Sequence, residues 1–126
     1  MSASAIVATK KALRSSLKKT LDALVPGEIS YQSGLTIEHV VSHPVFKRAQ
    51  VVSCYLSMPS GELETGELVR SILKEGKMLY VPRINRERGE LDMLRIYDEA
   101  DLESLPSGKW GIREPGLEKN GRPRMN

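Results

Sequence analysis

The hydrophobic pattern changes its period along the chain, and these changes mark the predicted elements. Residues 51–57, VVSCYLS, form a nearly continuous apolar run, which is typical of a buried strand. After Thr65, apolar residues recur at helical spacing: Leu68, Val69, Ile72 and Leu73. This spacing predicts a helix that Thr65 caps and Gly76 ends. Residues 78–81 form a second apolar strand, stopped at Pro82, so the three segments predict a right-handed crossover between parallel strands.

The remaining segments give weaker patterns. Residues 29–50 predict a helix interrupted by Pro44. Residues 91–96 alternate polar and apolar positions after a turn-rich stretch, and predict a third strand antiparallel to the second. Residues 98–106 predict a turn or a single helical turn, and residues 109–116 a loop. The whole therefore predicts one α/β domain at 1–118, with a disordered tail at 119–126 that lacks apolar anchors.

Near the N-terminus, a narrow apolar stripe is formed by Leu13, Leu17, Leu21 and Leu24. On an α-helix these leucines fall within about 40° of Leu17, so we expect them to face the core. Lys10 and Arg14 lie about 20° and about 60° from Leu17, beside the stripe rather than on the solvent face. Cations in such positions either extend outward to water or point at an anion in a cleft.

Composition narrows the class of protein. The 126 residues allow at most one domain, and 40% hydrophobic with 28% charged residues is ordinary for a globular protein. A net charge of +3 is too small to argue for nucleic acid, and no apolar run approaches the ~20 residues of a membrane span. Cys54 is the single cysteine, so no internal disulfide is possible, and its apolar strand predicts a small buried side chain. We expect a cytoplasmic monomer; the basic, acid-free first 21 residues leave a mitochondrial transit peptide as the alternative.

Candidate chemistry gathers where the predicted strands end, because ligands bind at the carboxyl ends of parallel strands. Glu62 and Glu64 follow the first strand; they could bind a ring that donates hydrogen bonds, act as acid or base, or hold a metal. Alternatively, they are acidic residues favoured near a helix N-terminus. Trp110 is either a lid on the local core or a platform for an aromatic ligand. His39 and His43 lack a third ligand nearby, so no metal site is predicted.

Several short motifs occur in an order that resembles the 5-formyltetrahydrofolate cyclo-ligase family over about residues 9–115: TKKALR, YLSM followed by ELET, VPRI, LDMLRI and KWGIREP. The resemblance implies a three-layer α/β sandwich with a mostly parallel sheet. It also implies closure of 5-formyltetrahydrofolate to 5,10-methenyltetrahydrofolate, with ATP and Mg²⁺ as cofactors; ATP is consumed, and ADP and phosphate are released.

The resemblance carries over to individual residues. It implies that Lys10 and Arg14 contact ATP phosphates, and that Leu56 and Glu62 bind the substrate. Two further positions are expected to line the folate pocket: Met93 and Trp110. No residue is assigned a catalytic or metal-binding role.

The family continues with a glycine-rich segment of the type GxGxGYYD, which supplies amides and cations to the phosphates and an aspartate to magnesium. The KNGRPRMN sequence at 119–126 does not replace it. We therefore expect a truncated fold, and no activity from these 126 residues alone. One alternative is a non-catalytic α/β remnant that binds folate weakly or needs a partner chain. Another, a small basic nucleic-acid binder, rests only on the pI of 9.1 and the N-terminal cations.

Overall fold

A three-stranded sheet in the order β1–β2–β3 organises the computed structural model, which describes residues 2–126. Its strands are β1 (Val51–Ser53), β2 (Met78–Asn85) and β3 (Glu90–Ile96). β1 pairs parallel with β2, and β2 pairs antiparallel with β3. Helix α4 (Gly66–Lys74) connects β1 to β2, so the predicted strand–helix–strand unit and the antiparallel third strand are confirmed. Within the described residues the sheet is mixed rather than mostly parallel.

Two strand boundaries differ from the sequence prediction. β1 ends at Ser53 instead of Ser57: Cys54 N donates one further hydrogen bond to Tyr80 O at 3.0 Å, and the chain then turns into a loop. β2 continues through Pro82, where the sequence predicted a stop. The pairing with β1 ends at Tyr80, so one edge of β2 is open at Pro82, and a proline is tolerated at an open edge.

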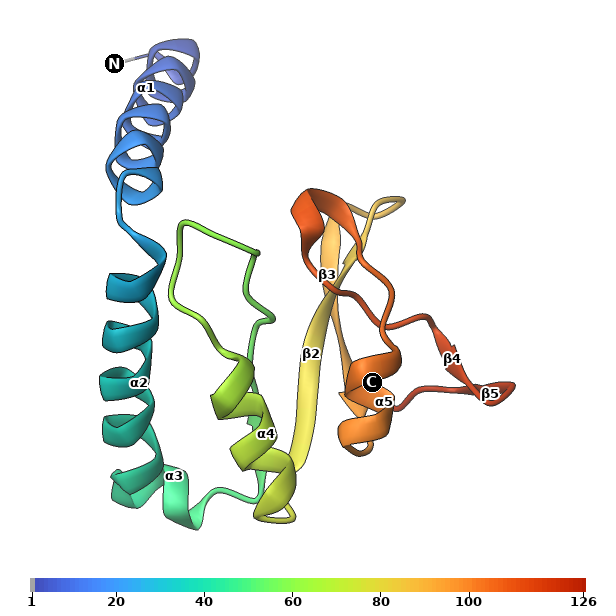
Figure 1. Cartoon of the computed structure of the whole chain (residues 1–126). Coiled ribbons are helices and arrows are strands. Elements are labelled where there is room, and N and C mark those ends of the chain that lie inside the picture. Colours follow the sequence, from blue (N-terminus) through green and yellow to red (C-terminus); the bar gives the residue numbers. More distant parts are fainter. Residues whose placement is uncertain (1) are drawn as a thin grey trace.

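Helices cover the sheet on both sides (Figure 1). α2 (Pro26–Ser42) and α4 lie on one side, and α5 (Glu99–Ser104) lies on the other. α3 (Pro44–Arg48) begins directly at Pro44, which confirms the predicted interruption. The core joins these layers through buried side chains from α3, α4, the sheet and α5: Phe46, Val69, Ile72, Leu79, Val81, Ile96 and Leu102. Burying each such side chain contributes about 1.5–3 kcal/mol.

Helix α1 (Ala3–Asp22) has no buried residue. Leu13, Leu17, Leu21 and Leu24 are all exposed, so the expectation that this stripe faces the core is wrong for the described residues. Figure 1 shows why: α1 extends past the end of the sheet, away from the layers that would bury it. Among the helices at positions 2–126, none combines the length and the apolar content that crossing a bilayer requires.

Residues 118–126 form an anchored hairpin, where composition predicted disorder for 119–126. β4 (Glu118–Lys119) and β5 (Arg122–Pro123) pair antiparallel, and Asn120 and Gly121, both at positive φ, make the turn. Arg124 is buried and donates two 2.7 Å hydrogen bonds to the Asp101 carboxylate of α5. This bidentate pair supplies the anchor that apolar side chains do not.

Candidate functional site

The loop between β1 and α4, residues 54–65, is closed by its own hydrogen bonds. Ser57 N donates to Thr65 Oγ1 and Thr65 N donates to Ser57 Oγ, both at 3.2 Å. The Thr65 hydroxyl donates to Tyr55 O at 2.8 Å. Thr65 therefore precedes α4 as predicted, but its side chain fastens the loop instead of capping the helix. The result is a fixed loop at the carboxyl end of β1.

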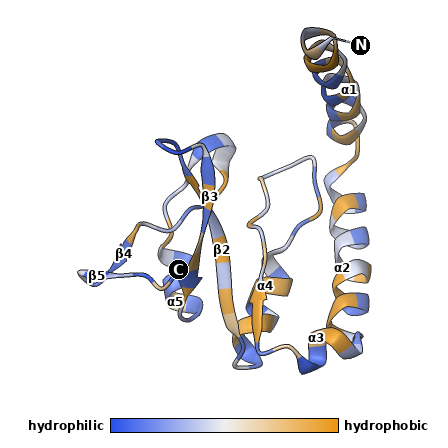
Figure 2. Ribbon diagram, turned by 180° about the vertical axis from the view of Figure 1, so that it is seen from behind, coloured by the Kyte–Doolittle hydropathy of each residue, from blue (hydrophilic) through white to orange (hydrophobic). Residues whose placement is uncertain are grey.

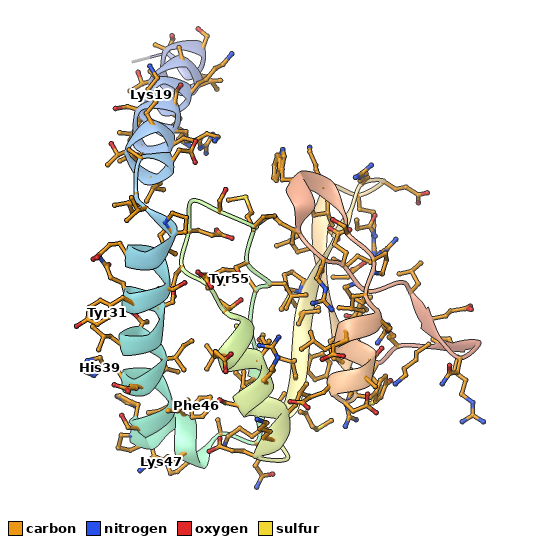
Figure 3. All side chains as sticks on the ribbon, in the orientation of Figure 1. Lys19, Tyr31, His39, Phe46, Lys47 and Tyr55 are labelled. Atoms are coloured by element: carbon orange, nitrogen blue, oxygen red, sulfur yellow. The ribbon has the colours of Figure 1, made fainter. Side chains whose placement is uncertain are left out.

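Both carboxylates of this loop have structural partners. Glu62 Oε1 accepts a hydrogen bond from Met58 N at 2.5 Å, across the tip of the loop. Glu64 Oε1 accepts one from the Ser30 hydroxyl of α2 at 2.9 Å. Burial raises the pKa of Tyr55, and the negative charge of Glu62 raises it further. Figure 3 shows Tyr55 projecting from this loop beside α4. A carboxylate held in place in this way can still accept hydrogen bonds from a ligand.

A cleft of about 620 Å³ lies between α1, the loop tip at 58–61 and Trp110. Arg14 and Lys18 line it from α1, together with apolar side chains of the leucine stripe. The loop tip approaches α1 closely, since a β-carbon on Gly61 would lie 2.9 Å from Asp22 Oδ1. Gly61 also has φ +78, a backbone conformation that favours glycine.

Trp110 forms the opposite wall of the cleft. It lies in the short 3₁₀ turn η1 (Lys109–Gly111) with φ 58 and ψ 24, the left-handed region that a bulky residue rarely adopts. Its side chain is 66% exposed, so burial in the core does not explain this conformation. Lys109 Nζ lies 4.5 Å from the ring centroid, a cation–π contact on one face of the indole. Retained backbone strain of this kind is typical of binding sites.

A second hollow of about 350 Å³ adjoins the cleft and shares the loop tip with it. Glu62 and Glu64 line this hollow, and Lys18 and Asp22 border both spaces. Arg14 and the indole of Trp110 line only the cleft, Glu62 and Glu64 line only the hollow, and the Lys18–Asp22 pair lies at their junction. Such an arrangement suits a ligand that is flat, anionic at one end and hydrogen-bonding at the other.

The structure brings only some of the sequence-predicted residues together. Arg14 and Trp110 share the cleft, and Glu62 lies in the adjoining hollow. Lys10 lies one turn nearer the N-terminus on α1 and is exposed. Leu56 is buried in the core at 8% exposure. Met93, the remaining sequence-predicted residue, is half-buried on β3 and pairs with Pro82 of β2.

Sequence reasoning gave no role to Lys18 or Asp22. The signal for Lys18 was present, because it continues the i, i+4 spacing of Lys10 and Arg14. Asp22 carries no such signal, since its place beside Gly61 depends on the fold.

The residues present fit a phosphate chain better than a magnesium ion. Arg14 and Lys18 place two cations at the cleft, which suits the charge of a nucleotide's phosphates. Across residues 2–126, no three side chains of the metal-ligating types gather at one point. We therefore derive no step through Mg²⁺ from these residues.

A larger apolar groove, about 740 Å³, lies toward the other end of α2. It follows β1 along the edge that has no strand partner in the described part of the chain, and Val40, Val45, Phe46 and Val52 line it. Figure 2 shows the apolar positions of α3 and the adjoining end of α2 together there. Its lining includes His39 and His43 but no carboxylate, lysine or arginine. The groove is therefore a packing surface rather than a site for polar chemistry.

Comparison with known proteins points to one family for this chain. The model of the 5-formyltetrahydrofolate cyclo-ligase family matches residues 6–125. The chain is 33% identical over 116 residues to the 5-formyltetrahydrofolate cyclo-ligase of Mus musculus, covering 92% of this chain and 57% of the relative. It is 31% identical over 112 residues to a probable 5-formyltetrahydrofolate cyclo-ligase of Caenorhabditis elegans, covering 89% and 54%.

A solved structure agrees with the sequence comparisons. The NMR structure of Aquifex aeolicus 5,10-methenyltetrahydrofolate synthetase superposes with a TM-score of 0.72 at 28% identity. The match covers 93% of this chain and 55% of that one. The chain thus spans little more than half the length of the relatives it matches.

Proposed function

Because the chain belongs to the 5-formyltetrahydrofolate cyclo-ligase family, we propose that it supplies the folate-binding and part of the ATP-binding surface for ATP-dependent closure of 5-formyltetrahydrofolate to 5,10-methenyltetrahydrofolate, with release of ADP and phosphate. The observation that carries the proposal is the cleft that Arg14, Trp110 and the loop tip line together. A cation and an exposed indole in one cleft match a ligand pair of phosphates and flat rings.

Each site residue has a distinct role in this proposal. Arg14 binds phosphate oxygens, and Lys10 binds more distal ones from the next turn of α1. The Trp110 ring stacks on the pterin or aminobenzoyl ring. Glu62 accepts hydrogen bonds from the N–H edge of the pterin, in the orientation fixed by its bond to Met58 N.

Two apolar residues have roles in folate binding outside the lining of the cleft and the adjoining hollow. Leu56 acts from the core, by holding the start of the loop in place. Met93 contributes a flexible apolar surface from β3. Phosphoryl transfer depends mainly on positioning and charge stabilisation, so these binding roles account for this chain's part in the reaction.

We further propose that residues 1–126 do not catalyse cyclisation alone. The sequence contains no glycine-rich phosphate cradle, and within the described residues 2–126 no three metal-ligating side chains gather at one point. Losing one preorganised oxyanion donor can reduce a rate by about 10²–10³, and here several would be absent together. The apolar groove beside β1 also leaves packing surface open at this end of the sheet.

An absorbance assay tests both proposals. The purified, mass-verified chain is mixed with ATP, magnesium and 5-formyltetrahydrofolate, and the methenyl product is measured. Quenching of Trp110 fluorescence by 5-formyltetrahydrofolate measures binding in parallel. We expect binding without turnover; turnover within tenfold of a full-length relative would contradict the inactivity proposal, and absence of folate binding would contradict the site.

The second candidate is a folate-binding protein without catalysis, or one that needs a partner chain. The open groove beside β1 favours the need for a partner, because a partner could cover that surface. One measurement separates the non-catalytic form from a ligase component. Adding the remaining part of a family relative would restore turnover if the chain is a ligase component or needs that partner, but not if it only binds folate.

Cellular location and oligomeric state stay predictions. We expect a monomer in the cytoplasm, with a small-molecule substrate and neither nucleic acid nor membrane as partner. The exposed basic α1, with no acidic residue before Asp22, keeps mitochondrial import as the alternative. A fluorescent fusion at residue 126 would distinguish the two compartments.

A further inference from the structure

Lys18 occupies a place in the site that neither the leucine pattern nor the family resemblance assigns. It lies one turn beyond Arg14 on α1, and both residues line the cleft that contains Trp110. Lys18 also borders the hollow that contains Glu62. Lys18 therefore lies at the junction of the two spaces, between the anionic end and the hydrogen-bonding end of a ligand that spans them.

Asp22 is the present partner of Lys18. Lys18 Nζ lies 2.5 Å from Asp22 Oδ2, and the two side chains are 74% and 48% exposed. An ion pair this exposed is weak, so an anion entering the cleft can compete for the lysine. Asp22 Oδ1 faces Gly61, where an added β-carbon would lie 2.9 Å away. Asp22 therefore lies close to the loop tip as well as to Lys18.

We propose that Arg14 and Lys18 together form an oxyanion site at the mouth of the cleft. Asp22 forms an ion pair with Lys18 until an oxyanion displaces it. The inference rests on the proposed function and adds a binding residue and an internal competitor to it. Residues one turn apart on a helix have β-carbons about 5–6 Å apart, so both cations reach one polyanion. The oxyanion is a nucleotide phosphate or a glutamate carboxylate of the folate, which share this chemistry.

Trp110 is the single tryptophan, so its fluorescence reports directly on the cleft. The wild-type chain is titrated with sodium tripolyphosphate and, separately, with 5-formyltetrahydrofolate. Lys18→Met keeps the side-chain length and removes the charge; Lys19→Met is the matched control, because Lys19 is exposed on the same helix and does not line the cleft. We expect Lys18→Met to weaken tripolyphosphate binding about fivefold and Lys19→Met less than about twofold.

Asp22→Asn separates competition from simple attraction. It keeps the shape beside Gly61 and removes the charge that holds Lys18. We expect tripolyphosphate to bind about two- to threefold more tightly. The gain should be smaller in the Lys18→Met background, because the lysine for which the two anions compete is gone. Equal gains in both backgrounds would contradict displacement.

The remaining outcomes are also decisive. The site would be overturned if Lys18→Met and Lys19→Met bound tripolyphosphate equally well and also bound 5-formyltetrahydrofolate equally well. It would also be overturned if the wild type bound neither probe. A Lys18→Met defect confined to 5-formyltetrahydrofolate would support the oxyanion site with a carboxylate as its ligand. Lys18-dependent binding of tripolyphosphate with no binding of folate would keep this site and remove the proposed folate function. Circular dichroism melting confirms that each exposed-site variant is folded.

Discussion

Gly111 lies so close to Pro59 that a β-carbon at position 111 would be 2.9 Å from Pro59 Cγ. The contact joins the turn that carries Trp110 to the tip of the loop after β1. Gly61 makes the equivalent approach to Asp22 of α1, also at 2.9 Å. Two glycines at positive φ therefore allow the three walls of the cleft to approach one another closely.

Gly111→Ala should damage the cleft more than backbone strain alone explains. An alanine at positive φ costs about 1 kcal/mol, and displacing Pro59 adds about 1–3 kcal/mol. Gly121→Ala is the matched control, because Gly121 has φ +77 but nothing within 4 Å of its added β-carbon. We expect thermal melting to show the larger loss for Gly111→Ala, with weaker folate quenching of Trp110 in that variant only. Similar losses in both variants would mean that the contact with Pro59 is unimportant.

Lys10 and Glu62 should affect different ligands. In a protein that carries the complete catalytic machinery, Lys10→Ala should raise the apparent ATP requirement more than the folate requirement. Glu62→Gln should do the reverse, since it removes a carboxylate acceptor from the pterin side. The measurement is the apparent KM for each substrate in the methenyl absorbance assay. If both variants shift both constants equally, the pocket is misassigned.

The strand–helix–strand unit could be predicted because its signals are local. A nearly continuous apolar run, helical spacing after Thr65 and a second apolar run each lie within a few residues. The path of the loop at 54–65 could not be predicted, because it depends on the Ser57–Thr65 bonds and on the distant Ser30 of α2. Local pattern made Arg14 and Trp110 separate candidates, but the lining of one cleft by both has no periodic signal.

Residues 118–126 show where composition misleads. Asn120–Gly121 is a strong turn signal, which a count of apolar residues overlooks. The burial of Arg124 has no local signal, because its partner Asp101 comes from α5. The leucine stripe of α1 misleads in another way. Its periodicity predicts an amphipathic helix, but it does not predict what the apolar face contacts.

The Asp101–Arg124 pair should make stability fall in acid. Burial raises the pKa of Asp101, but hydrogen bonds from Arg124 and Tyr97 N outweigh it, so the pKa lies below its usual value. The stabilisation is therefore present above the unfolded-state pKa of about 3.9 and is lost as pH falls below it. Urea unfolding between pH 6 and pH 3 should show this loss, and Asp101→Asn should show a shallower one.

At neutral pH, Asp101→Asn should reduce the free energy of unfolding by about 3 kcal/mol, because it leaves Arg124 buried without its counter-ion. The exposed pair of Arg70 with Glu67 is the control. Glu67→Gln should cost less than about 1 kcal/mol. Equal costs for the two substitutions would show that the buried pair is not an anchor.

Cys54 should be chemically inert in the folded protein. Its side chain is buried, and burial raises the pKa of the thiol, so little thiolate forms at neutral pH. We expect a thiol-specific disulfide reagent to modify it only at the rate of unfolding, and at once in denaturant. Complete modification of the folded chain within the mixing time would contradict this.

The anchoring of α5 by Arg124 has a consequence for synthesis on the ribosome. Asp101 is made 23 residues before its partner. At a synthesis rate of about 5–20 residues per second, Asp101 is incorporated about 1–5 s before Arg124. During that interval the Asp101 carboxylate has no counter-ion, so it is more stable in water than buried. The nascent β3–α5 region should therefore stay loosely packed after the β1–α4–β2 unit has formed.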